Sequence, residues 1–212
     1  VKSIKIGVEQ GSSIEPMDNP FRYRIAIWGS SFTHGSCTSR AGMTYPAQFS
    51  RNTGLQMLSL GCSGRCLLQD YFCDVLVDVD ADAFVFDSFS NPRADMIKER
   101  LVPFIDRMIA AHPGKPMIFQ QTIYREKRNF NVAEDDKERA KMEMAASIFK
   151  EIKSTPQGRK KYKDVYFIVP DACPPSHEGS VDGVHPDNYG YTLWYRSVEK
   201  PILKILKKYG IR

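Results

Sequence analysis

Hydrophobic residues along the chain fall into short runs of strand length, separated by longer stretches with helical spacing. The short runs predict strands at 23–28, 55–60, 83–89, 117–121 and 165–169. The longer stretches predict helices at about 45–52, 67–77, 94–111, 134–153 and 188–208. This alternation predicts an α/β domain in which helices cover both faces of a parallel sheet.

The start of the chain has a different pattern. Apolar Ile4, Ile6 and Val8 alternate with charged or small residues, which predicts a strand, and a linker follows it. We therefore expect an N-terminal strand and linker over residues 1–20, either as the remnant of an upstream domain or as an edge strand. Residues 21–212 are expected to form a single domain.

Composition adds few constraints. The chain has 212 residues, of which 42% are hydrophobic and 26% charged, as in ordinary globular domains. No apolar run is long enough to span a bilayer. The net charge of +5 is concentrated at 159–163 and 204–208. Tyr162 is the single aromatic residue within these clusters, fewer than a stacking platform requires, which favours a solvated loop and a helix end over a nucleic-acid site.

Cysteine spacing argues against a metal site. No CxxC pair occurs, so we predict no zinc site. The compartment and the disulfide pairing are open from the residues alone. The five cysteines are Cys37, Cys62, Cys66, Cys73 and Cys173.

A serine follows the first strand of the predicted sheet. The strand breaks at Gly29, which lets the backbone turn sharply and delivers Ser31 into the turn. If a helical turn begins there, its free N–H groups favour developing negative charge. Ser31 is therefore a candidate nucleophile, with a simple capping role as the alternative.

A carboxylate and an imidazole, Asp182 and His185, stand three residues apart near the end of the chain. An imidazole can take and return a proton near neutral pH, and a carboxylate can orient it. Because the carboxyl ends of parallel strands share one edge of a sheet, we expect these side chains to meet Ser31 there. We predict a hydrolytic triad of Ser31, His185 as general base and Asp182. An ordinary surface turn is the alternative for this segment.

Two further loops at the same edge supply candidate hydrogen-bond donors. Gly64 follows the second strand of the predicted sheet and Asn91 the third. With the N–H of Ser31, the N–H of Gly64 and the side-chain amide of Asn91 would form an oxyanion hole. The alternative is that both residues only shape strand-to-helix turns.

Other polar residues near these loops are candidates for substrate binding. His34 is expected to line the pocket, and His177 is a rival base or a substrate-binding residue. Arg125, Lys127 and Arg128 follow the fourth strand and could contact a polar or anionic substrate, although a solvated loop is favoured.

With these residues in view, the sequence resembles the SGNH hydrolases, also called the GDSL lipase/esterase superfamily. Ser30 stands where the family name has Asp, and Pro92 follows Asn91 where the family usually has Asp. The four family blocks match, in order, at Gly29-Ser30-Ser31-Phe32, Gly64, Asn91 and Asp182-Gly183-Val184-His185.

The resemblance implies a three-layer α/β/α sandwich with a five-stranded, flavodoxin-like parallel sheet. It gives the same residues the roles of triad and oxyanion hole, and it implies no metal or organic cofactor. The run 29–46 is similar to a bacterial subgroup whose catalytic domain follows a β-sandwich. Many members are exported and named acetylhydrolases or carbohydrate esterases, so the resemblance favours a periplasmic or secreted protein.

The functional prediction is a carboxylic ester hydrolase. A serine esterase would remove short acyl groups, acetyl first among them, from a small-molecule or carbohydrate ester through an acyl-enzyme. An acyltransferase could use the same triad. A non-catalytic module that binds glycans or phosphate is a third reading, because a glycine-containing turn after a strand can also cradle phosphate. The oligomeric state is open.

Overall fold

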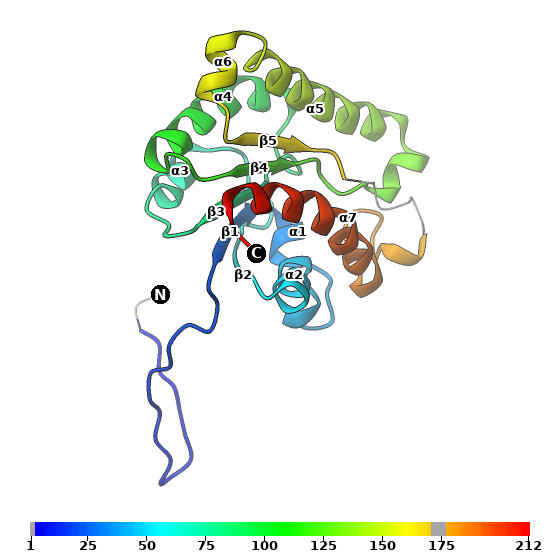
Figure 1. Cartoon of the computed structure of the whole chain (residues 1–212). Helices are drawn as coiled ribbons and strands as arrows, with labels where there is room; N and C mark the ends of the chain where they lie inside the picture. Colours follow the sequence, from blue (N-terminus) through cyan, green and yellow to red (C-terminus); the bar gives the residue numbers. More distant parts are fainter. Residues whose placement is uncertain (1–2, 171–176) are drawn as a thin grey trace.

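The computed structural model describes residues 3–170 and 177–212. At its centre is a parallel sheet of five strands in the order β2-β1-β3-β4-β5 (Figure 1). The strands are β1 Arg24–Gly29, β2 Gln56–Gly61, β3 Ala83–Asp87, β4 Met117–Gln120 and β5 Val165–Ile168. The predicted fold class is confirmed, and each predicted strand of the sheet is present.

Helices cover both faces of the sheet. The α-helices are α1 Ser31–His34, α2 Tyr45–Thr53, α3 Asp70–Leu76, α4 Ala94–Ala111, α5 Val132–Glu151, α6 Pro156–Lys161 and α7 Asn188–Leu206. Shorter 3-10 helices are η1 Ala41–Met43, η2 Glu126–Phe130, η3 His177–Gly179 and η4 Lys207–Tyr209. Helices α3, α4 and α5 lie on one face, and α1, α2 and α7 on the other (Figure 1). No helix in the described ranges combines the length and apolarity needed to cross a bilayer.

Strand β1, which lies between β2 and β3, contributes to both halves of the core. Ala26 and Trp28 pack in the cluster with α3, α4 and α5, whereas Ile25 and Ile27 pack in the cluster with α2 and α7. Successive side chains of a strand point to opposite faces. A strand covered on both faces therefore reads as one continuous apolar run, which is why the sequence located β1 so clearly.

The strand order fixes where a site can form. The chain moves from β1 to β2 on one side and places β3 on the other, so the switch point lies between β1 and β3. Ligands in open α/β sheets bind at the carboxyl ends of the strands near such a point. Ser31 follows β1 directly, and the loop after β3 carries Asn91.

Helix α6 was not predicted. Residues 159–163 were expected to lie in a solvated loop, but Arg159 to Lys161 form the last turn of this helix. Thr155 caps the helix, with its hydroxyl accepting from the N–H of Gly158 at 3.0 Å, and Pro156 occupies the first turn. A helix of six residues is too short to show apolar periodicity.

The N-terminal segment runs away from the body of the protein (Figure 1). Ile4, Ile6 and Val8 are 81%, 73% and 50% exposed. Residues 3–20 form no strand, in contrast to the expectation from their alternating pattern. A strand needs a partner for its backbone groups, and the described part of the chain places none beside this segment. Its assignment to an upstream domain, and the boundary after residue 20, stay predictions.

The close approach of α1 to the end of β2 depends on Gly61. A Cβ atom at this position would lie 2.3 Å from the backbone N of His34 and 2.6 Å from its Cα. Because backbone atoms cannot yield as a side chain can, we expect Gly61→Ala to lower the free energy of unfolding by about 1–3 kcal/mol. Urea denaturation measures the change.

Gly42→Ala is the matched control for this substitution. A Cβ atom there would approach nothing closer than 3.8 Å, so its effect should stay within about 0.5 kcal/mol. Equal stabilities of the two variants would contradict the packing described for α1.

Candidate active site

Ser31 is the first residue of α1, directly beyond β1. The Ser30 hydroxyl caps the helix by accepting from the N–H of Phe32 at 3.3 Å. A Cβ atom at Gly29 would lie 2.0 Å from Thr33 Oγ1, so only glycine allows the helix to start so close to the strand. Ser31 is 6% exposed.

The structure brings Ser31, His185 and Asp182 together. His185 Nε2 lies 3.1 Å from Ser31 Oγ, and His185 Nδ1 lies 2.8 Å from Asp182 Oδ2. With its proton on Nδ1, the imidazole donates to Asp182 and accepts from the Ser31 hydroxyl. This is the order of contacts that a nucleophile, a general base and an orienting carboxylate require.

The loop that carries the imidazole is closed at its base and anchored at its tip. Ser180 and Pro186 form an isolated antiparallel bridge. The N–H of Lys127 donates to the carbonyl of Gly183 at 2.9 Å, which ties the tip to η2. Gly183 has a φ of +77°, a conformation that favours glycine. His185 is therefore held by contacts of its loop as well as by its contacts with Ser31 and Asp182.

Asp182 is bound so that its ionised form is favoured. Partial burial raises its pKa, but hydrogen bonds from the N–H and the ring of His185 and from the N–H of Val184 outweigh that effect and lower the pKa to about 2. The two N–H groups donate to Oδ1 at 2.7 and 2.9 Å. The other oxygen, Oδ2, is left for the imidazole, so the carboxylate has one fixed orientation.

Asn91 and Gly64 lie in the loops after β3 and β2. The N–H of Cys66 donates to Asn91 Oδ1 at 3.3 Å, which fixes which end of the amide is the oxygen. Gly64 has a φ of +67° in a turn closed by a 3.1 Å hydrogen bond from Arg65 N–H to the Cys62 carbonyl. Within residues 3–170 and 177–212, the structure gives no protein acceptor to Asn91 Nδ2 or to the N–H groups of Gly64 and Ser31.

A buried polar network beneath α1 was not predicted. Asp87 is fully buried at the end of β3, and its Oδ2 accepts from Thr33 at 2.9 Å and from Tyr45 at 2.8 Å. Gln120 at the end of β4 donates to the Tyr45 hydroxyl at 3.1 Å. Burial raises the pKa of Asp87, against the lowering effect of these hydrogen bonds. The network fixes α1, and with it Ser31, to two strand ends.

The remaining predicted site residues are less informative. His34 is exposed, with Nδ1 3.3 Å from the carbonyl oxygen of Gly61. The side chain of His177 lies outside the described residues, so its predicted role stays open.

Four cysteines are free in the structure, and the fifth, Cys173, lies outside the described part. The described residues contain no group of three or more side chains suited to a metal ion.

The loop after β4 differs from the solvated loop that the sequence favoured. The side chains of Arg125 and Arg128 are only 12% and 14% exposed, because the first turns of α5 supply carboxylates to them. Arg125 binds Glu138, and Arg128 binds Asp135, each at 2.8 Å. The sequence does contain a signal for this pairing, because the helix that follows the loop begins with acidic residues.

Comparison with known proteins settles the family. A model of the GDSL-like lipase/acylhydrolase family matches residues 22–204. The chain belongs to this family. The match confirms the resemblance to SGNH hydrolases that the sequence blocks predicted. None of the curated proteins matches this chain.

Solved structures share the fold. A protein from Bacteroides ovatus ATCC 8483, named a GDSL-like lipase, is 35% identical with a TM-score of 0.86 over 94% of this chain and 58% of its own. The salicylyl-acyltransferase SsfX3 of a tetracycline biosynthetic pathway is 20% identical, with a TM-score of 0.73 over 97% of this chain and 60% of its own. A family two carbohydrate esterase from Cellvibrio japonicus is 14% identical, with a TM-score of 0.65 over 91% and 64%. The chain thus spans about three fifths of the length of these proteins.

The pKa of Asp182 predicts a pH dependence of stability. A carboxyl whose pKa falls to about 2 on folding stabilises the folded state above pH 4 and loses this effect as the pH falls toward 2. Because the side chain is half-exposed, we expect the ionised carboxylate to add only about 1 kcal/mol to the free energy of unfolding. Asp182→Asn should be less stable than wild type by this amount at pH 5.

The difference between the two proteins should shrink as the pH falls from 4 to 2, because the wild-type carboxyl then takes up its proton. Urea denaturation across this range measures it. A difference that stays constant with pH would contradict the assigned environment of Asp182.

Proposed function

We propose that this protein is a serine esterase that hydrolyses short-chain acyl esters through an acyl-enzyme. The observation that carries the proposal is the contact chain from Ser31 Oγ to His185 Nε2, at 3.1 Å, and from His185 Nδ1 to Asp182 Oδ2, at 2.8 Å. Family membership supports ester bonds as the target.

In the first half of the reaction, Ser31 Oγ attacks the ester carbonyl carbon while His185 Nε2 takes the hydroxyl proton. Asp182 stabilises the resulting imidazolium and keeps Nε2 directed at the serine. When the tetrahedral intermediate collapses, the carbon–oxygen bond to the alcohol breaks and the imidazolium returns the proton to the leaving oxygen. The acyl group remains on Ser31.

In the second half, water replaces the alcohol. His185 takes a proton from the water as its oxygen attacks the acyl carbon, and the bond to Ser31 then breaks. The proton passes to Ser31 Oγ, which restores the hydroxyl and releases the carboxylic acid. Both halves pass through an oxyanion, for which Asn91 Nδ2 and the N–H groups of Gly64 and Ser31 are the proposed donors.

The proposed substrate is an acetyl or other short acyl ester of a carbohydrate or small alcohol. Carbohydrate esterases among the solved structures support this class, and a two-domain esterase active on acetylated mannans has a TM-score of 0.58 to the chain. The acyltransferase SsfX3 shares the fold as well. Transfer to an acceptor hydroxyl is therefore the second candidate, since it differs only in the group that attacks the acyl-enzyme.

Ser31→Ala should abolish turnover of p-nitrophenyl acetate and labelling by a fluorophosphonate probe, because both need the Oγ nucleophile. Its thermal stability should remain close to that of wild type, since no helix cap is lost. Turnover and probe labelling are measured on the purified protein beside a melting curve.

Ser30→Ala is the matched control. It removes the neighbouring hydroxyl and the cap of α1, which costs about 1 kcal/mol of stability, but it leaves Ser31 Oγ in place. Ser30→Ala should therefore lose stability but keep its activity, whereas Ser31→Ala should lose its activity but keep its stability. Undiminished turnover in Ser31→Ala would refute the proposal.

Product analysis tests hydrolysis against transfer. For an esterase, acetate and p-nitrophenol should form in equal amounts even with sugars or short alcohols present as competing acceptors. Acetate well below p-nitrophenol, with the missing acetyl groups recovered on the acceptor, would favour the transferase.

A further inference from the structure

The carbonyl of Ser90 accepts hydrogen bonds from two buried cations. Arg125 Nη2 donates to this carbonyl oxygen at 2.7 Å and to Ser90 Oγ at 2.7 Å. Lys141 Nζ donates to the same carbonyl oxygen at 2.9 Å. The two cations come from the loop after β4 and from α5, so three segments of the chain meet at one peptide group.

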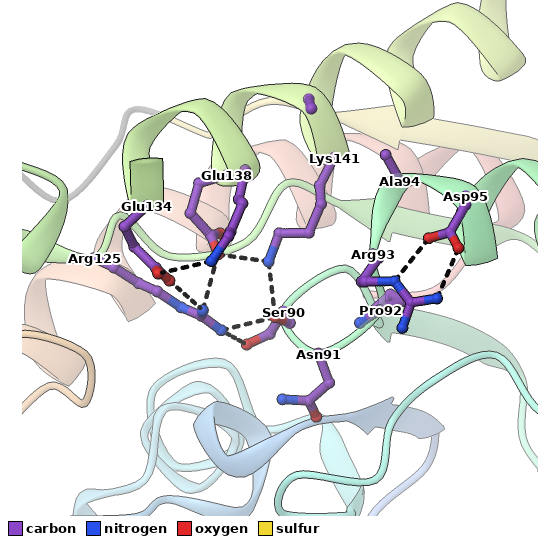
Figure 2. Close-up of a pocket in the computed structure, with 12 residues that line it drawn as sticks. Ser90, Asn91, Pro92, Arg93, Ala94, Asp95, Arg125, Glu134, Glu138 and Lys141 are labelled. Carbon is purple, nitrogen blue, oxygen red and sulfur yellow. Dashed lines mark hydrogen bonds and ion pairs between the residues drawn. The ribbon is translucent and has the colours of Figure 1, made fainter. Parts of the chain in front are cut away.

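Glu138 holds both cations in place. Its Oε1 accepts from Arg125 Nη1 at 2.8 Å and from Lys141 Nζ at 2.6 Å. The three side chains are 3%, 12% and 7% exposed for Glu138, Arg125 and Lys141. Charges that are buried, paired and hydrogen-bonded in this way favour a single arrangement, because moving one partner away leaves another uncompensated. Figure 2 shows the cluster gathered on one side of the Ser90 loop.

Arg125, Lys141 and Glu138 together form a clamp on the Ser90 carbonyl. This clamp acts on the next residue through the peptide bond. The carbonyl of Ser90 and the N and Cα of Asn91 lie in one rigid plane, so fixing the carbonyl fixes where Asn91 starts. At the far end of the side chain, the N–H of Cys66 binds Asn91 Oδ1 at 3.3 Å. Asn91 points away from the cluster in Figure 2. It is thus held at its backbone and at its oxygen, while Nδ2 is left without a protein acceptor among the described residues.

Arg125 also contacts the helix of the nucleophile. Its Cζ lies 5.7 Å from the centroid of the Phe32 ring, in cation–π geometry. The same ring meets the His185 ring edge-on, with centroids 5.8 Å apart. One guanidinium therefore lies against both the loop of the proposed oxyanion donor and the residue that follows Ser31.

We propose that Arg125 and Lys141, held by Glu138, are positioning residues that lock the Ser90–Asn91 peptide plane and thereby aim the Asn91 amide at the developing oxyanion. The inference rests on the proposed function. Neither cation touches the reacting atoms; both act through Asn91. Their loss should lower kcat and leave KM unchanged, because the donor is used most strongly in the transition state.

The test combines substitutions at the clamp with removal of the donor itself. Arg125→Lys keeps a charge but loses the two-pronged contact with Ser90, and Lys141→Met removes one donor while Arg125 still pairs with Glu138. Each is made in the full chain, alone and with Asn91→Ala. Turnover of p-nitrophenyl acetate, the rate of fluorophosphonate labelling and the melting temperature are measured for every variant.

We expect Asn91→Ala to lower kcat about 100- to 1000-fold and each clamp variant about 10-fold, because a misplaced donor costs less than a missing one. In the Asn91→Ala background, the clamp variants should cause no further loss. Labelling rates should follow the same pattern. A purely structural role would instead give equal fold-losses in both backgrounds.

Arg128→Lys is the matched control. Arg128 lies in the same loop, is buried to a similar extent, pairs with a carboxylate of α5 and stacks on Tyr124 at 4.7 Å. It contacts neither Ser90 nor Phe32 in the structure, so its substitution should leave kcat unchanged.

Chemical rescue adds a second readout. A pocket of about 400 Å³ between α4 and α5 is lined by Arg125, Lys141 and Asn91. Free guanidinium added to Arg125→Ala should restore part of the lost kcat through this opening, whereas Asn91→Ala should not respond.

The possible results distinguish a failure of the clamp from a failure of the proposed esterase function. Loss of kcat that vanishes in the Asn91→Ala background supports the clamp. Additive losses, or folded clamp variants with wild-type kcat, overturn it while Ser31→Ala remains inactive. A wild-type protein that neither turns over esters nor reacts with the probe overturns the proposed function, and the clamp's role with it.

Discussion

The hydrogen bond between Ser31 and His185 is the interaction on which the rest of the site depends. It joins residues 154 positions apart in the chain, at a distance of 3.1 Å between Oγ and Nε2. Neither side chain could hold this geometry alone. The serine is fixed because α1 begins immediately after β1, and the imidazole is fixed because its loop is closed at the base and bound at the tip. The parallel sheet makes the meeting possible by bringing both segments to one edge.

Each member of this contact is held by a second layer of polar groups, of which those around Asp87 are buried. Asp182 orients the imidazole and is itself oriented by two N–H groups. Asp87, through Thr33 and Tyr45, fixes the helix that carries the serine. Such buried networks are costly when one member is missing, because an unpaired polar group remains away from water. They give the short helix α1 a rigidity that four residues could not provide.

Much of this architecture could be predicted from the sequence, for a physical reason. Strands covered on both faces are continuous apolar runs, so the local sequence alone is enough to locate them. Because parallel strands share one carboxyl edge, Ser31, Asn91 and His185 are then assigned to that edge without any knowledge of side-chain positions. The predictions that failed concern segments that are short or that depend on partners far away in the sequence. Helix α6 is too brief to show periodicity, and residues 3–20 had a strand pattern without a strand beside them.

The supporting residues of the site could not be found in this way. Asp87 did leave a signal, because a carboxylate ends an otherwise apolar strand, but its partners come from α1, α2 and β4. Arg125 stood in a loop that looked solvated, and only the structure shows it between Ser90, Phe32 and Glu138. Contacts between separate elements follow no spacing rule, so the sequence reveals the proposed reacting groups more readily than the residues that position them.

Mass-spectrometric mapping of the residue that becomes covalently modified tests the central claim most directly. After brief incubation with a fluorophosphonate or with a slowly deacylated ester, the modification should lie on Ser31, and replacing His185 should slow its appearance by orders of magnitude. Modification of a different residue, or a labelling rate that does not depend on His185, would contradict the account.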